Sequence, residues 1–462
     1  MAKKVYVVGH RNPDNDSICS AVAYAYLKNE ASKNALDEGK EIEYYYEPVR
    51  LGPMPPETQW LFKKYKIKPP RAIRHVYGRV RDVMTSKPKC IKMHEKMIEA
   101  GRRMKANRIK SLVVVDDNNN YKGLITTRMI ADRYIASTDL FGPEKNVTAV
   151  AADLIKSLDE KVSDLMETEV LEVDGNDLLK DAQDRLMNHH LREAVVLKEI
   201  NGGKKKCVGI ITRSDVIKPL HKNVVLVDHN EALQAPQGIE EANILEIIDH
   251  HRIADITTLH PIKFMNLPVG ATASIVTSEF ENYKHRNISI PKKLAAALLS
   301  AILTDTVILH SPTTTAFDCR MAKDLASILK VDIDKFGQSI FKAKGDDSKI
   351  EISDLVTRDS KEFQLGDQKV LICQHETINV EKVMKREAEI RSFLKKLKEE
   401  SEYEFVLLMI TDIIKRGSLF VAEGNIQILN KVFDIKCCGS GGTWMPHIVS
   451  RKLQVAPKII GV

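Results

Sequence analysis

No run of apolar residues in the 462-residue sequence approaches the roughly 18 that a transmembrane helix requires. The seven cysteines are odd in number and scattered, with no Cys-x-x-Cys pair, so neither a disulfide framework nor a cysteine-rich zinc site is expected. The first nine residues, Met-Ala-Lys-Lys-Val-Tyr-Val-Val-Gly, lead into a strand and lack the apolar core and cleavage site of a signal peptide. These absences predict a protein of a reducing cytoplasm.

Aromatic residues are also scarce, at 6% of the chain, and they do not alternate with basic residues. A groove for single-stranded RNA would need aromatic side chains on which bases stack. The formal net charge of +7 is small for this length, so it indicates a weak preference for anionic partners and no nucleic-acid footprint. Hydrophobic and charged contents of 43% and 29% are those of a soluble globular protein, and the length suggests about three domains.

An internal repeat occupies about residues 73–220. Three pairs of segments match in type and order: 80–84 with 162–166, 111–115 with 193–197, and 123–126 with 209–212. Each copy is expected to contain a helix, a β-hairpin and a second helix. Two such units packed together can share one core.

The repeated unit resembles the CBS (cystathionine β-synthase) domain through its opening Val-x-Asp-[Val/Leu]-Met and its closing Gly-[Leu/Ile]-Ile-Thr. CBS domains work in pairs and commonly bind adenine nucleotides, so the resemblance implies AMP, ADP or ATP as a regulator. Thr212 and Asp215 match the residues that usually meet phosphate and ribose, and Thr126 is the counterpart of Thr212 in the first copy. Met129 replaces the aspartate there, which predicts one asymmetric site rather than two. A folding or dimerisation module without a ligand is the alternative.

The segments that flank the repeat read as one α/β domain with a parallel sheet. Residues 4–8 form a short apolar strand, followed by a loop with His10, Asp14 and Asp16 and then by an apolar helix. In α/β proteins such loops lie at the carboxyl ends of the strands, where sites form. Asp16 alone could be no more than a helix N-cap.

Two later strands and one helix also end in residue types that bind metals. They end, in chain order, at Asp228, at Asp249-His250-His251 and at Asp305. Carboxylates gathered at one edge of a sheet repel one another unless bound cations neutralise them. This ligand set suits Mn²⁺, Co²⁺ or Mg²⁺, with Zn²⁺ or Fe²⁺ as alternatives. Two such ions about 3.5–4 Å apart are a standard device for phosphoryl hydrolysis.

Neighbouring residues of a continuing strand point to opposite faces, so His250 and His251 can serve one site only if the strand ends before them. The other adjacent pair, His189-His190, lies inside the repeat and has Asn107-Arg108 as its counterpart in the first copy. It has no acidic cluster nearby, so we expect it to bind no metal.

Four motifs resemble, in order and spacing, those of the DHH phosphoesterase superfamily: His10-x-x-x-Asp14-x-Asp16, Asp228-His229-Asn230, Asp249-His250-His251 and Asp305. This superfamily includes RecJ-type nucleases, oligoribonucleases and family II inorganic pyrophosphatases. In these proteins the strand ends at the aspartate and both histidines lie on the turn. One of them binds metal and the other faces the substrate.

The last third of the chain favours a pyrophosphatase over a nuclease. Residues 439–444, Gly-Ser-Gly-Gly-Thr-Trp, are only superficially like the nucleotide grip of DHH nucleases. Ser-Arg-Lys-x-Gln at 450–454 resembles the pyrophosphatase segment whose basic residues bind the anionic substrate, here Arg451 and Lys452, and Lys342 matches a third basic contact. The combination resembles CBS-domain-containing family II inorganic pyrophosphatases.

This resemblance implies an α/β protein whose parallel-sheet DHH domain is interrupted by a tandem CBS pair and followed by a smaller α/β substrate-binding domain of the DHHA2 type. The expected domains are the DHH domain at 1–70 and 222–328, the CBS domains at 71–137 and 138–221, and the final domain at 329–462. A homodimer in the cytoplasm is expected, with no nucleic-acid or membrane partner.

The resemblance also implies a distribution of six metal ligands over two ions: His10 and Asp14 on one, Asp16 and His250 on the other, and Asp228 and Asp305 bridging both. Asp249 would orient His250. A hydroxide generated by the metals would attack one phosphorus of pyrophosphate.

Other residues would act on the substrate. Lys342, Arg451 and Lys452, with an additional Mg²⁺, would neutralise the leaving phosphate, and His251 would contact the leaving oxygen as a donor or acid. Closure of the final domain would exclude water. Two other functions stay open: a phosphodiesterase for short RNA or cyclic dinucleotides, and a non-catalytic nucleotide sensor.

Overall fold

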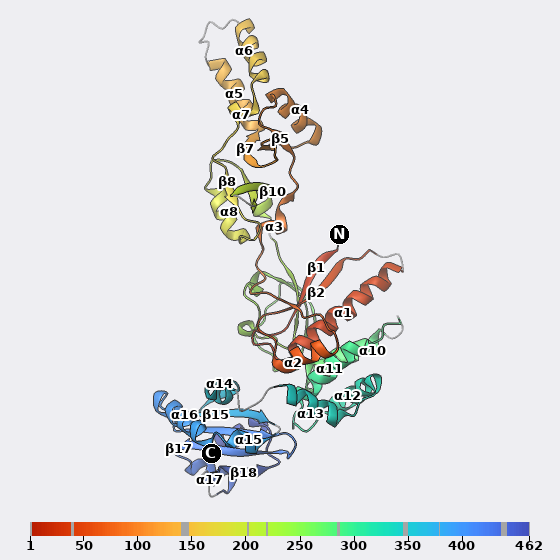
Figure 1. Cartoon of the computed structure of the whole chain (residues 1–462), viewed down its shortest axis with the longest axis vertical. Coiled ribbons are helices and arrows are strands. Elements are labelled where there is room, and N and C mark those ends of the chain that lie inside the picture. The colour runs from red at the N-terminus through yellow and green to blue at the C-terminus, as the bar shows by residue number, and fades with distance from the viewer. Residues whose placement is uncertain are drawn as a thin grey trace. The chain divides into compact units, whose positions relative to one another are not determined.

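The computed structural model describes residues 2–37, 41–139, 147–200, 203–218, 220–283, 287–344, 350–377, 379–435 and 441–461. The chain forms two compact units (Figure 1). One unit combines Met1–Val76 with Lys222–Val462, and the other is the inserted segment Tyr77–His221. Among the described helices, none has both the length and the apolar character needed to cross a membrane.

A six-stranded parallel sheet forms the first part of the larger unit, with the strand order β13-β12-β11-β1-β2-β3. Its strands are β1 Lys3–Val8, β2 Tyr44–Arg50, β3 Arg71–Ala72, β11 Asn223–Val227, β12 Asn243–Asp249 and β13 Lys263–Asn266. β1 pairs in parallel with β2 on one side and with β11 on the other. The first strand after the insertion therefore pairs with the first strand of the chain, and the predicted parallel sheet is confirmed.

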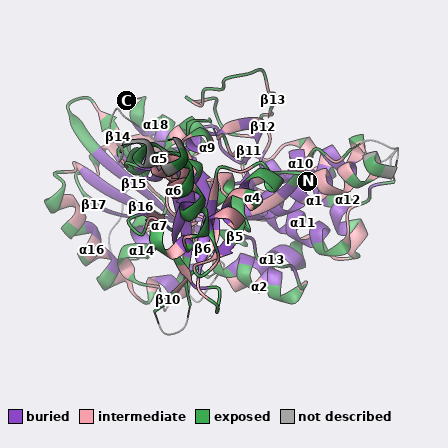
Figure 2. Cartoon of the chain, turned by 90° about the horizontal axis from the view of Figure 1, so that it is seen from above, coloured by how far each residue is buried: buried purple, intermediate pink, exposed green. Residues whose placement is uncertain are grey.

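One face of this sheet is covered by 3₁₀ turns and loops, and the other is covered by helices, which bury its apolar residues. The helices are α1 Asn15–Asp37, α2 Pro56–Lys64, α10 Thr272–Asn282, α11 Lys292–Asp305, α12 Ala316–Leu329 and α13 Ile333–Ala343, with 3₁₀ turns η1 Ala232–Gln234 and η2 Ile239–Glu241. Every residue of α11 from Leu294 to Leu303 is buried. A helix that is apolar on all sides belongs in the interior, and Figure 2 shows α11 largely in the colour of buried residues.

The inserted unit contains two copies of the predicted repeat. The first copy contributes α3 Val80–Val83, β4 Thr85–Ser86, β5 Cys90–Lys92, α4 Met97–Asn107, β6 Ser111–Val115, β7 Tyr121–Thr126 and α5 Thr127–Asp139. The second contributes α6 Val147–Asp159, α7 Val162–Leu165, β8 Leu171–Val173, α8 Leu179–Met187, β9 Glu193–Ile200, β10 Lys204–Thr212 and α9 Arg213–Ile217. The sheets have the orders β5-β6-β7 and β4-β10-β9-β8, so β4 of the first copy pairs with β10 of the second.

Two glycines explain why the closing Gly-[Leu/Ile]-Ile-Thr of each copy begins with glycine. A Cβ on Gly209 would lie 2.5 Å from Sδ of Met84, and a Cβ on Gly123 would lie 2.5 Å from the carbonyl oxygen of Glu167. Each glycine thus lets the opening segment of the other copy approach closely. Both copies contribute to one core, which confirms the expected sharing: Val113, Val115, Leu124, Val195, Leu197 and Ile210.

A five-stranded sheet forms the C-terminal domain, with the strands in chain order: β14 Ser360–Leu365, β15 Gln368–Thr377, β16 Phe405–Asp412, β17 Gly417–Gly424 and β18 Thr443–Pro446. Its helices are α14 Ile352–Thr357, α15 Val380–Met384, α16 Glu387–Glu400, α17 Gln427–Phe433 and α18 Ala456–Ile460, and a π-helical turn spans Arg451–Val455. Alternate residues of the central strand β16 enter two different cores, because successive side chains of a strand point to opposite faces.

A left-handed turn directly follows α11. Val307, Ile308 and Leu309 have φ values of 50°, 54° and 64°, which β-branched and bulky residues rarely adopt. Ile308 packs against α13, where a Cβ added to the buried Gly337 would lie 2.8–3.1 Å from three of its side-chain carbons. The close approach of this turn therefore requires glycine in the interior of α13.

Replacing Gly337 with alanine is expected to destabilise the larger unit by about 1–3 kcal/mol, because the added methyl group overpacks the contact with Ile308. The same change inside a helix is ordinarily stabilising by about 1 kcal/mol. Gly101 in α4 is a matched control, since nothing lies within 4 Å of its would-be Cβ. Calorimetry should show opposite shifts for Gly337→Ala and Gly101→Ala; stabilisation by both would contradict the packing argument.

Candidate functional site

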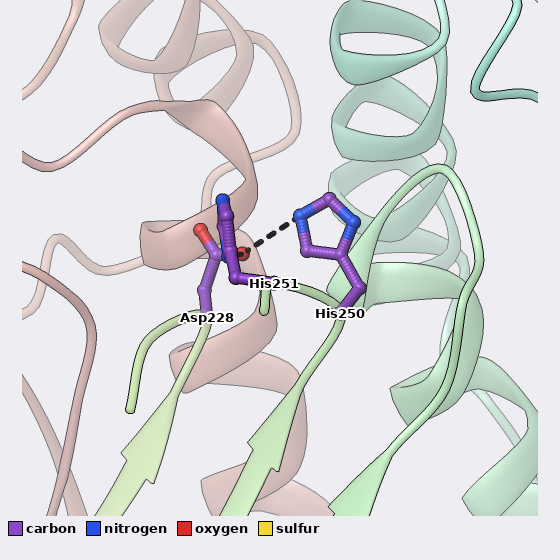
Figure 3. Close-up of side chains that lie close together, drawn as sticks. All are labelled: Asp228, His250 and His251. Atoms are coloured by element: carbon purple, nitrogen blue, oxygen red, sulfur yellow. Dashed lines mark ion pairs between the residues drawn. The ribbon is translucent and has the colours of Figure 1, made fainter. Parts of the chain in front are cut away.

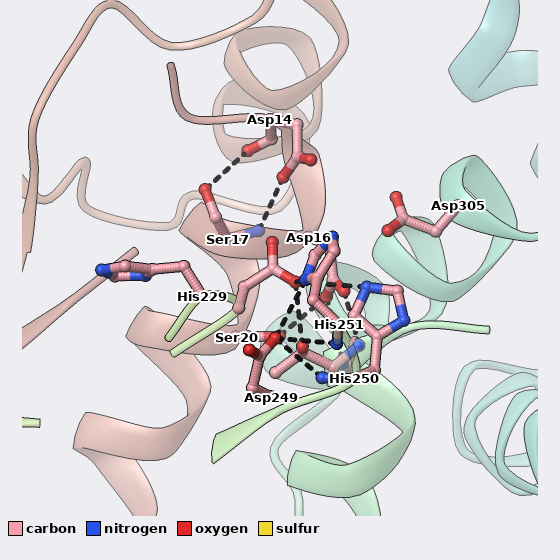
Figure 4. A network of polar contacts seen from close by, with 12 residues as sticks. Asp14, Asp16, Ser17, Ser20, His229, Asp249, His250, His251 and Asp305 are labelled. Carbon is pink, nitrogen blue, oxygen red and sulfur yellow. Dashed lines mark hydrogen bonds and ion pairs between the residues drawn. The ribbon is translucent and has the colours of Figure 1, made fainter. Parts of the chain in front are cut away.

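Three neighbouring strands and one helix end at the same place. β12, β11 and β1 are adjacent and parallel, so their carboxyl ends meet at one edge of the sheet. His10 and Asp14 lie in the loop after β1, Asp228 follows β11, and Asp249 is the last residue of β12. Asp305 is the last residue of α11 and faces the same cluster (Figure 4).

The turn after β12 brings both histidines to one site (Figure 3). Oδ1 of Asp249 accepts hydrogen bonds from the backbone N–H groups of His250 (2.8 Å) and His251 (3.1 Å), so the strand ends at the aspartate. Nδ1–H of His251 donates to the same oxygen at 2.9 Å, whereas Nδ1–H of His250 donates to the carbonyl oxygen of Val269 at 3.0 Å. The prediction that Asp249 orients the His250 ring is wrong, because its carboxylate holds the ring of His251 instead.

Asp228 lies between His10 and His250. Its side chain is buried, and its backbone has a φ of 64°. Its Oδ2 lies 3.5 Å from Nε2 of His10, and its Oδ1 lies 3.5 Å from Nε2 of His250. Oδ2 of Asp228 and Nε2 of His250 are buried and have no hydrogen-bond partner among the described residues. Buried polar atoms of this kind require an explanation, and ligation of a cation supplies one.

Asp16 lies in α1 and is fully buried, but its carboxylate accepts hydrogen bonds from the start of a different helix, α10. Its carboxylate accepts hydrogen bonds from the backbone N–H groups of Thr272 (2.6 Å) and Ala273 (2.9 Å), which open α10. Unpaired N–H groups at the start of a helix favour a carboxylate. At the start of α1 it is Asp14 that accepts from the N–H of Ser17, at 2.8 Å, so the simple N-cap interpretation of Asp16 is wrong.

All six predicted metal ligands take part in clusters in which one potential ligand atom from each side chain lies within 4.8 Å of the others. The clusters are His10, Asp14 and Asp228; Asp16, His250 and Asp305; and Asp228, His250 and His251. The first two correspond to the two predicted ions, and Asp228 occurs in two clusters. Asp305 belongs only to the second, so its expected bridging to the first is not part of this geometry.

The carboxylates of the site repel one another. Burial first, and then the charges of Asp228 and Asp14, raise the pKa of Asp16 well above its usual range. Burial and the charge of Asp16 raise the pKa of Asp305 in the same way. Burial alone would lower the pKa of His10, but its contacts with Asp14 and Asp228 raise that pKa to about 11. A bound divalent cation would relieve this repulsion, and the carboxylate and imidazole donors fit Mn²⁺ or Co²⁺.

Sequence reasoning missed several residues that hold the side chains of the site in place, among them Asn230 and Thr272. The amide of Asn230 donates to Oδ2 of Asp249. It stands two residues after Asp228 in the same motif, which could have drawn attention to it. The hydroxyl of Thr272 donates to Oδ1 of Asp228 at 2.9 Å, and nothing in the ordinary helical sequence around it signals this role. His229 instead donates to the carbonyl oxygen of its own strand, and burial lowers its pKa to about 4.

The predicted substrate residues lie elsewhere in the larger unit. Lys342, near the end of α13, and Lys452 are exposed, and within the described residues neither makes a hydrogen bond or ion pair. The guanidinium of Arg451 donates to the carboxylate of Asp359 at 2.7 Å and to its carbonyl oxygen at 2.6 Å. Arg451 is therefore fixed within the C-terminal domain. Of the glycine-rich segment, Gly439 and Ser440 lie outside the described residues.

The inserted unit contains a cavity of about 700 Å³ beside β10. Thr212 lines it, together with one acidic residue, Glu193, and six basic ones: Lys87, Lys89, Arg108, Lys110, Arg192 and Arg213. Asp215 accepts from the N–H (2.9 Å) and the hydroxyl (2.7 Å) of Thr212 and so fixes that residue. Thr126 is buried, does not line this cavity, and accepts from the N–H of Met129 at 3.3 Å.

Comparison with known proteins gives matches in both parts of the larger unit. The DHH family, N-terminal domain, matches residues 4–302, and the DHHA2 domain matches residues 338–462. The cobalt-dependent inorganic pyrophosphatase of Clostridium perfringens is 29% identical over 99% of this chain and 98% of its own. The manganese-dependent inorganic pyrophosphatase of Bacillus subtilis is 29% identical over 98% of this chain and 97% of its own.

A relative from Archaeoglobus fulgidus, assigned as a manganese-dependent inorganic pyrophosphatase, is 40% identical over 52% of this chain and 73% of its own. A crystal structure from Methanococcus jannaschii, of a protein assigned to the family II inorganic pyrophosphatases, shares the fold with a TM-score of 0.53 and 24% identity over 99% of this chain and 98% of its own. The chain therefore belongs to the DHH family and, within it, to the inorganic pyrophosphatases represented by the Archaeoglobus fulgidus relative, with the unit Tyr77–His221 inserted into its DHH domain.

Proposed function

We propose that the chain hydrolyses inorganic pyrophosphate to two phosphates with two divalent cations, Mn²⁺ or Co²⁺, in the cluster at the sheet edge. The observation that supports this most is the gathering of all six predicted ligands at one sheet edge, where Asp228 lies 3.5 Å from His10 on one side and 3.5 Å from His250 on the other. The relatives from Clostridium perfringens and Bacillus subtilis are named as cobalt- and manganese-dependent pyrophosphatases, which agrees with the donor set. A cytoplasmic homodimer is the setting we propose.

Two groups of side chains would hold the cations, with His10 and Asp14 on one, Asp16, His250 and Asp305 on the other, and Asp228 shared between them. Bound there, the cations supply a hydroxide nucleophile at neutral pH and offset the charge of the phosphoryl oxygens. Nδ1–H of His250 is held by Val269, so its Nε2 lone pair faces the site. A second partner that fixes the tautomer of a ligand histidine is typical of metal sites.

His251 would act on the substrate rather than on a metal alone. Its Nδ1 is engaged by Asp249, which leaves Nε2 for the substrate. Burial opposes the charged form, but the hydrogen bond with Asp249 and the charge of Asp228 raise the pKa of His251. A protonated imidazole can donate to the bridging or leaving oxygen of pyrophosphate.

Lys342, Arg451 and Lys452 would neutralise the leaving phosphate, with an additional Mg²⁺ on the substrate. Arg451 is pre-positioned by Asp359, whereas the two lysines are exposed and able to reach an anion. Pyrophosphate is small and highly charged, so a few cationic side chains suit it better than aromatic stacking platforms. Hydrolysis of short RNA or cyclic dinucleotides is the alternative, and it would leave these basic residues as nucleic-acid contacts.

The CBS pair would regulate this activity by binding an adenine nucleotide in the cavity beside β10. The excess of basic side chains around that cavity supports an anionic ligand. Thr212, fixed by Asp215, would meet the phosphate. Thr126, the counterpart of Thr212 in the first copy, is buried and therefore not exposed to a ligand. This supports one nucleotide site rather than two.

Mn²⁺ or Co²⁺ is expected to raise the unfolding temperature of the larger unit and to leave that of the inserted unit unchanged. An ion that binds only the folded site adds about 2.7 kcal/mol at 100 times its Kd. Calorimetry of chelator-treated protein, with and without added ion, checks this, and the inserted unit is the internal control. Equal shifts of both transitions would contradict binding at the sheet edge.

Wild-type protein loaded with Mn²⁺ or Co²⁺ is expected to release phosphate from pyrophosphate and Mg²⁺, and Asp305→Ala should lower kcat by roughly 10²- to 10³-fold or more because it removes charge from the metal pair. Asp324→Ala, which removes an exposed carboxylate of α12, serves as the control and should leave the rate unchanged. Near-normal turnover by Asp305→Ala would refute the assignment. Cleavage of short RNA without phosphate release from pyrophosphate would favour the alternative.

AMP and ATP are expected to bind the wild-type chain and to alter its rate of phosphate release. Lys110→Glu places a negative charge in the basic cavity and should weaken nucleotide binding by roughly tenfold or more. Lys180→Glu makes the same charge change on the surface of the same unit, outside the cavity, and should bind normally. Calorimetric titration measures both; equal affinities of the two variants would argue against this cavity.

A further inference from the structure

We propose that Asp318 is a positioning residue that holds the segment Val269–Ala273, and through that segment three of the metal ligands. The inference rests on the proposed metal-dependent function. Asp318 lies in α12 and belongs to none of the ligand clusters found among the described residues. Its side chain is nevertheless completely buried.

The segment Val269–Ala273 contacts three ligands from three different elements. The carbonyl oxygen of Val269 accepts from Nδ1–H of His250 at 3.0 Å. The backbone N–H groups of Thr272 and Ala273 donate to Asp16 at 2.6 and 2.9 Å. The hydroxyl of Thr272 donates to Asp228 at 2.9 Å. A displacement of this segment would therefore move two ligands of one proposed ion, Asp16 and His250, and Asp228, which is shared by both ions.

The segment runs from the loop after β13 into the first two residues of α10. Asp318 supplies the anchor. Its Oδ2 accepts from the N–H of Gly270 at 2.8 Å, and its Oδ1 accepts from the hydroxyl of Ser274 at 2.6 Å. One carboxylate thus binds the chain just before α10 and again within its first turn. The residues that donate to Asp16 and Asp228 lie between these two contacts.

The position of Asp318 is itself fixed by the start of its own helix. Its Oδ2 also accepts from the N–H (2.8 Å) and the hydroxyl (2.6 Å) of Thr315, the N-cap of α12. At the same point, a Cβ on Gly270 would lie 2.6 Å from Thr306, the residue after the ligand Asp305. A side chain at position 270 would thus not fit between Thr306 and Asp318, so the close approach of the segment to both residues requires glycine there.

Groups that hold metal ligands in place commonly change metal affinity by about 10- to 100-fold when they are removed. Asp318→Ala is expected to weaken Co²⁺ binding by that factor and to change the visible absorption spectrum of the bound ion, which reports ligand geometry. Asp318→Asn should restore most of both. Its amide oxygen can accept from Gly270 and Thr315 while its NH₂ group donates to the hydroxyl of Ser274.

Thr315→Val is the matched control. It removes the hydroxyl that donates to Asp318 from the start of α12, and it leaves the hydrogen bond from Gly270 intact. The backbone N–H at position 315 still donates to Asp318 and keeps its carboxylate in place, so this variant should lower the unfolding temperature with no change in the Co²⁺ affinity or spectrum. Ser274→Ala is the milder variant on the segment's side, should Asp318→Ala not fold, and is expected to weaken Co²⁺ binding by roughly three- to tenfold.

Titration of chelator-treated, folded protein with Co²⁺, followed by absorption, decides the question without any measurement of turnover. Weakened binding with an altered spectrum in Asp318→Ala or Ser274→Ala, and not in Thr315→Val, supports the inference. Unchanged Co²⁺ affinity and spectrum in the Asp318→Ala protein, or in Ser274→Ala where Asp318→Ala does not fold, overturns it while the proposed function stands. A wild-type chain that binds no Co²⁺ overturns both.

Discussion

The repulsion among carboxylates at the end of the parallel sheet is the constraint around which the larger unit is arranged. Oxygen atoms of Asp14 and Asp228 lie within 4.8 Å, as do those of Asp16 and Asp305. Two like charges at that separation cost about 3–4 kcal/mol at an effective dielectric constant near 20. Several such pairs would consume much of the 5–15 kcal/mol by which a folded protein is stable. Bound cations would turn this cost into binding energy, and metal binding would then be coupled to the stability of the larger unit.

The fold tolerates this arrangement because other polar groups are fixed around it. The start of α10 donates to Asp16, and the hydroxyl of Thr272 donates to Asp228. Asp249 ties both histidines to the end of β12 through their backbone N–H groups. The pairing of β1 with β11 keeps the sheet edge intact although the segment Tyr77–His221 is inserted between them in the chain. The insertion can therefore add a second compact unit without changing the order of the candidate ligands along the sheet edge.

Every strand or helix that contributes a predicted ligand could be predicted from the sequence. The reason is that each of these ligands stands at or just after the end of a strongly apolar strand, or at the end of an apolar helix. The repeat could also be predicted from the sequence. Gly123 and Gly209 recur in it because a side chain at either position would clash with the other copy. Individual hydrogen bonds were not predictable. Asp249 holds the ring of His251 rather than that of His250 because the turn after β12 directs His250 toward Val269, and no local pattern encodes that direction. Asp318 and Thr272 are distant in sequence from the ligands they support, so only the folded chain reveals them.

The central claim is that two cations share Asp228. Electron paramagnetic resonance of chelator-treated protein titrated with Mn²⁺ tests it most directly, because two Mn²⁺ ions about 3.5–4 Å apart interact magnetically. We expect two ions per chain at saturation, with a spectrum of a coupled pair that is lost in Asp228→Asn. One ion per chain, or two that give only the spectrum of isolated Mn²⁺, would contradict the account.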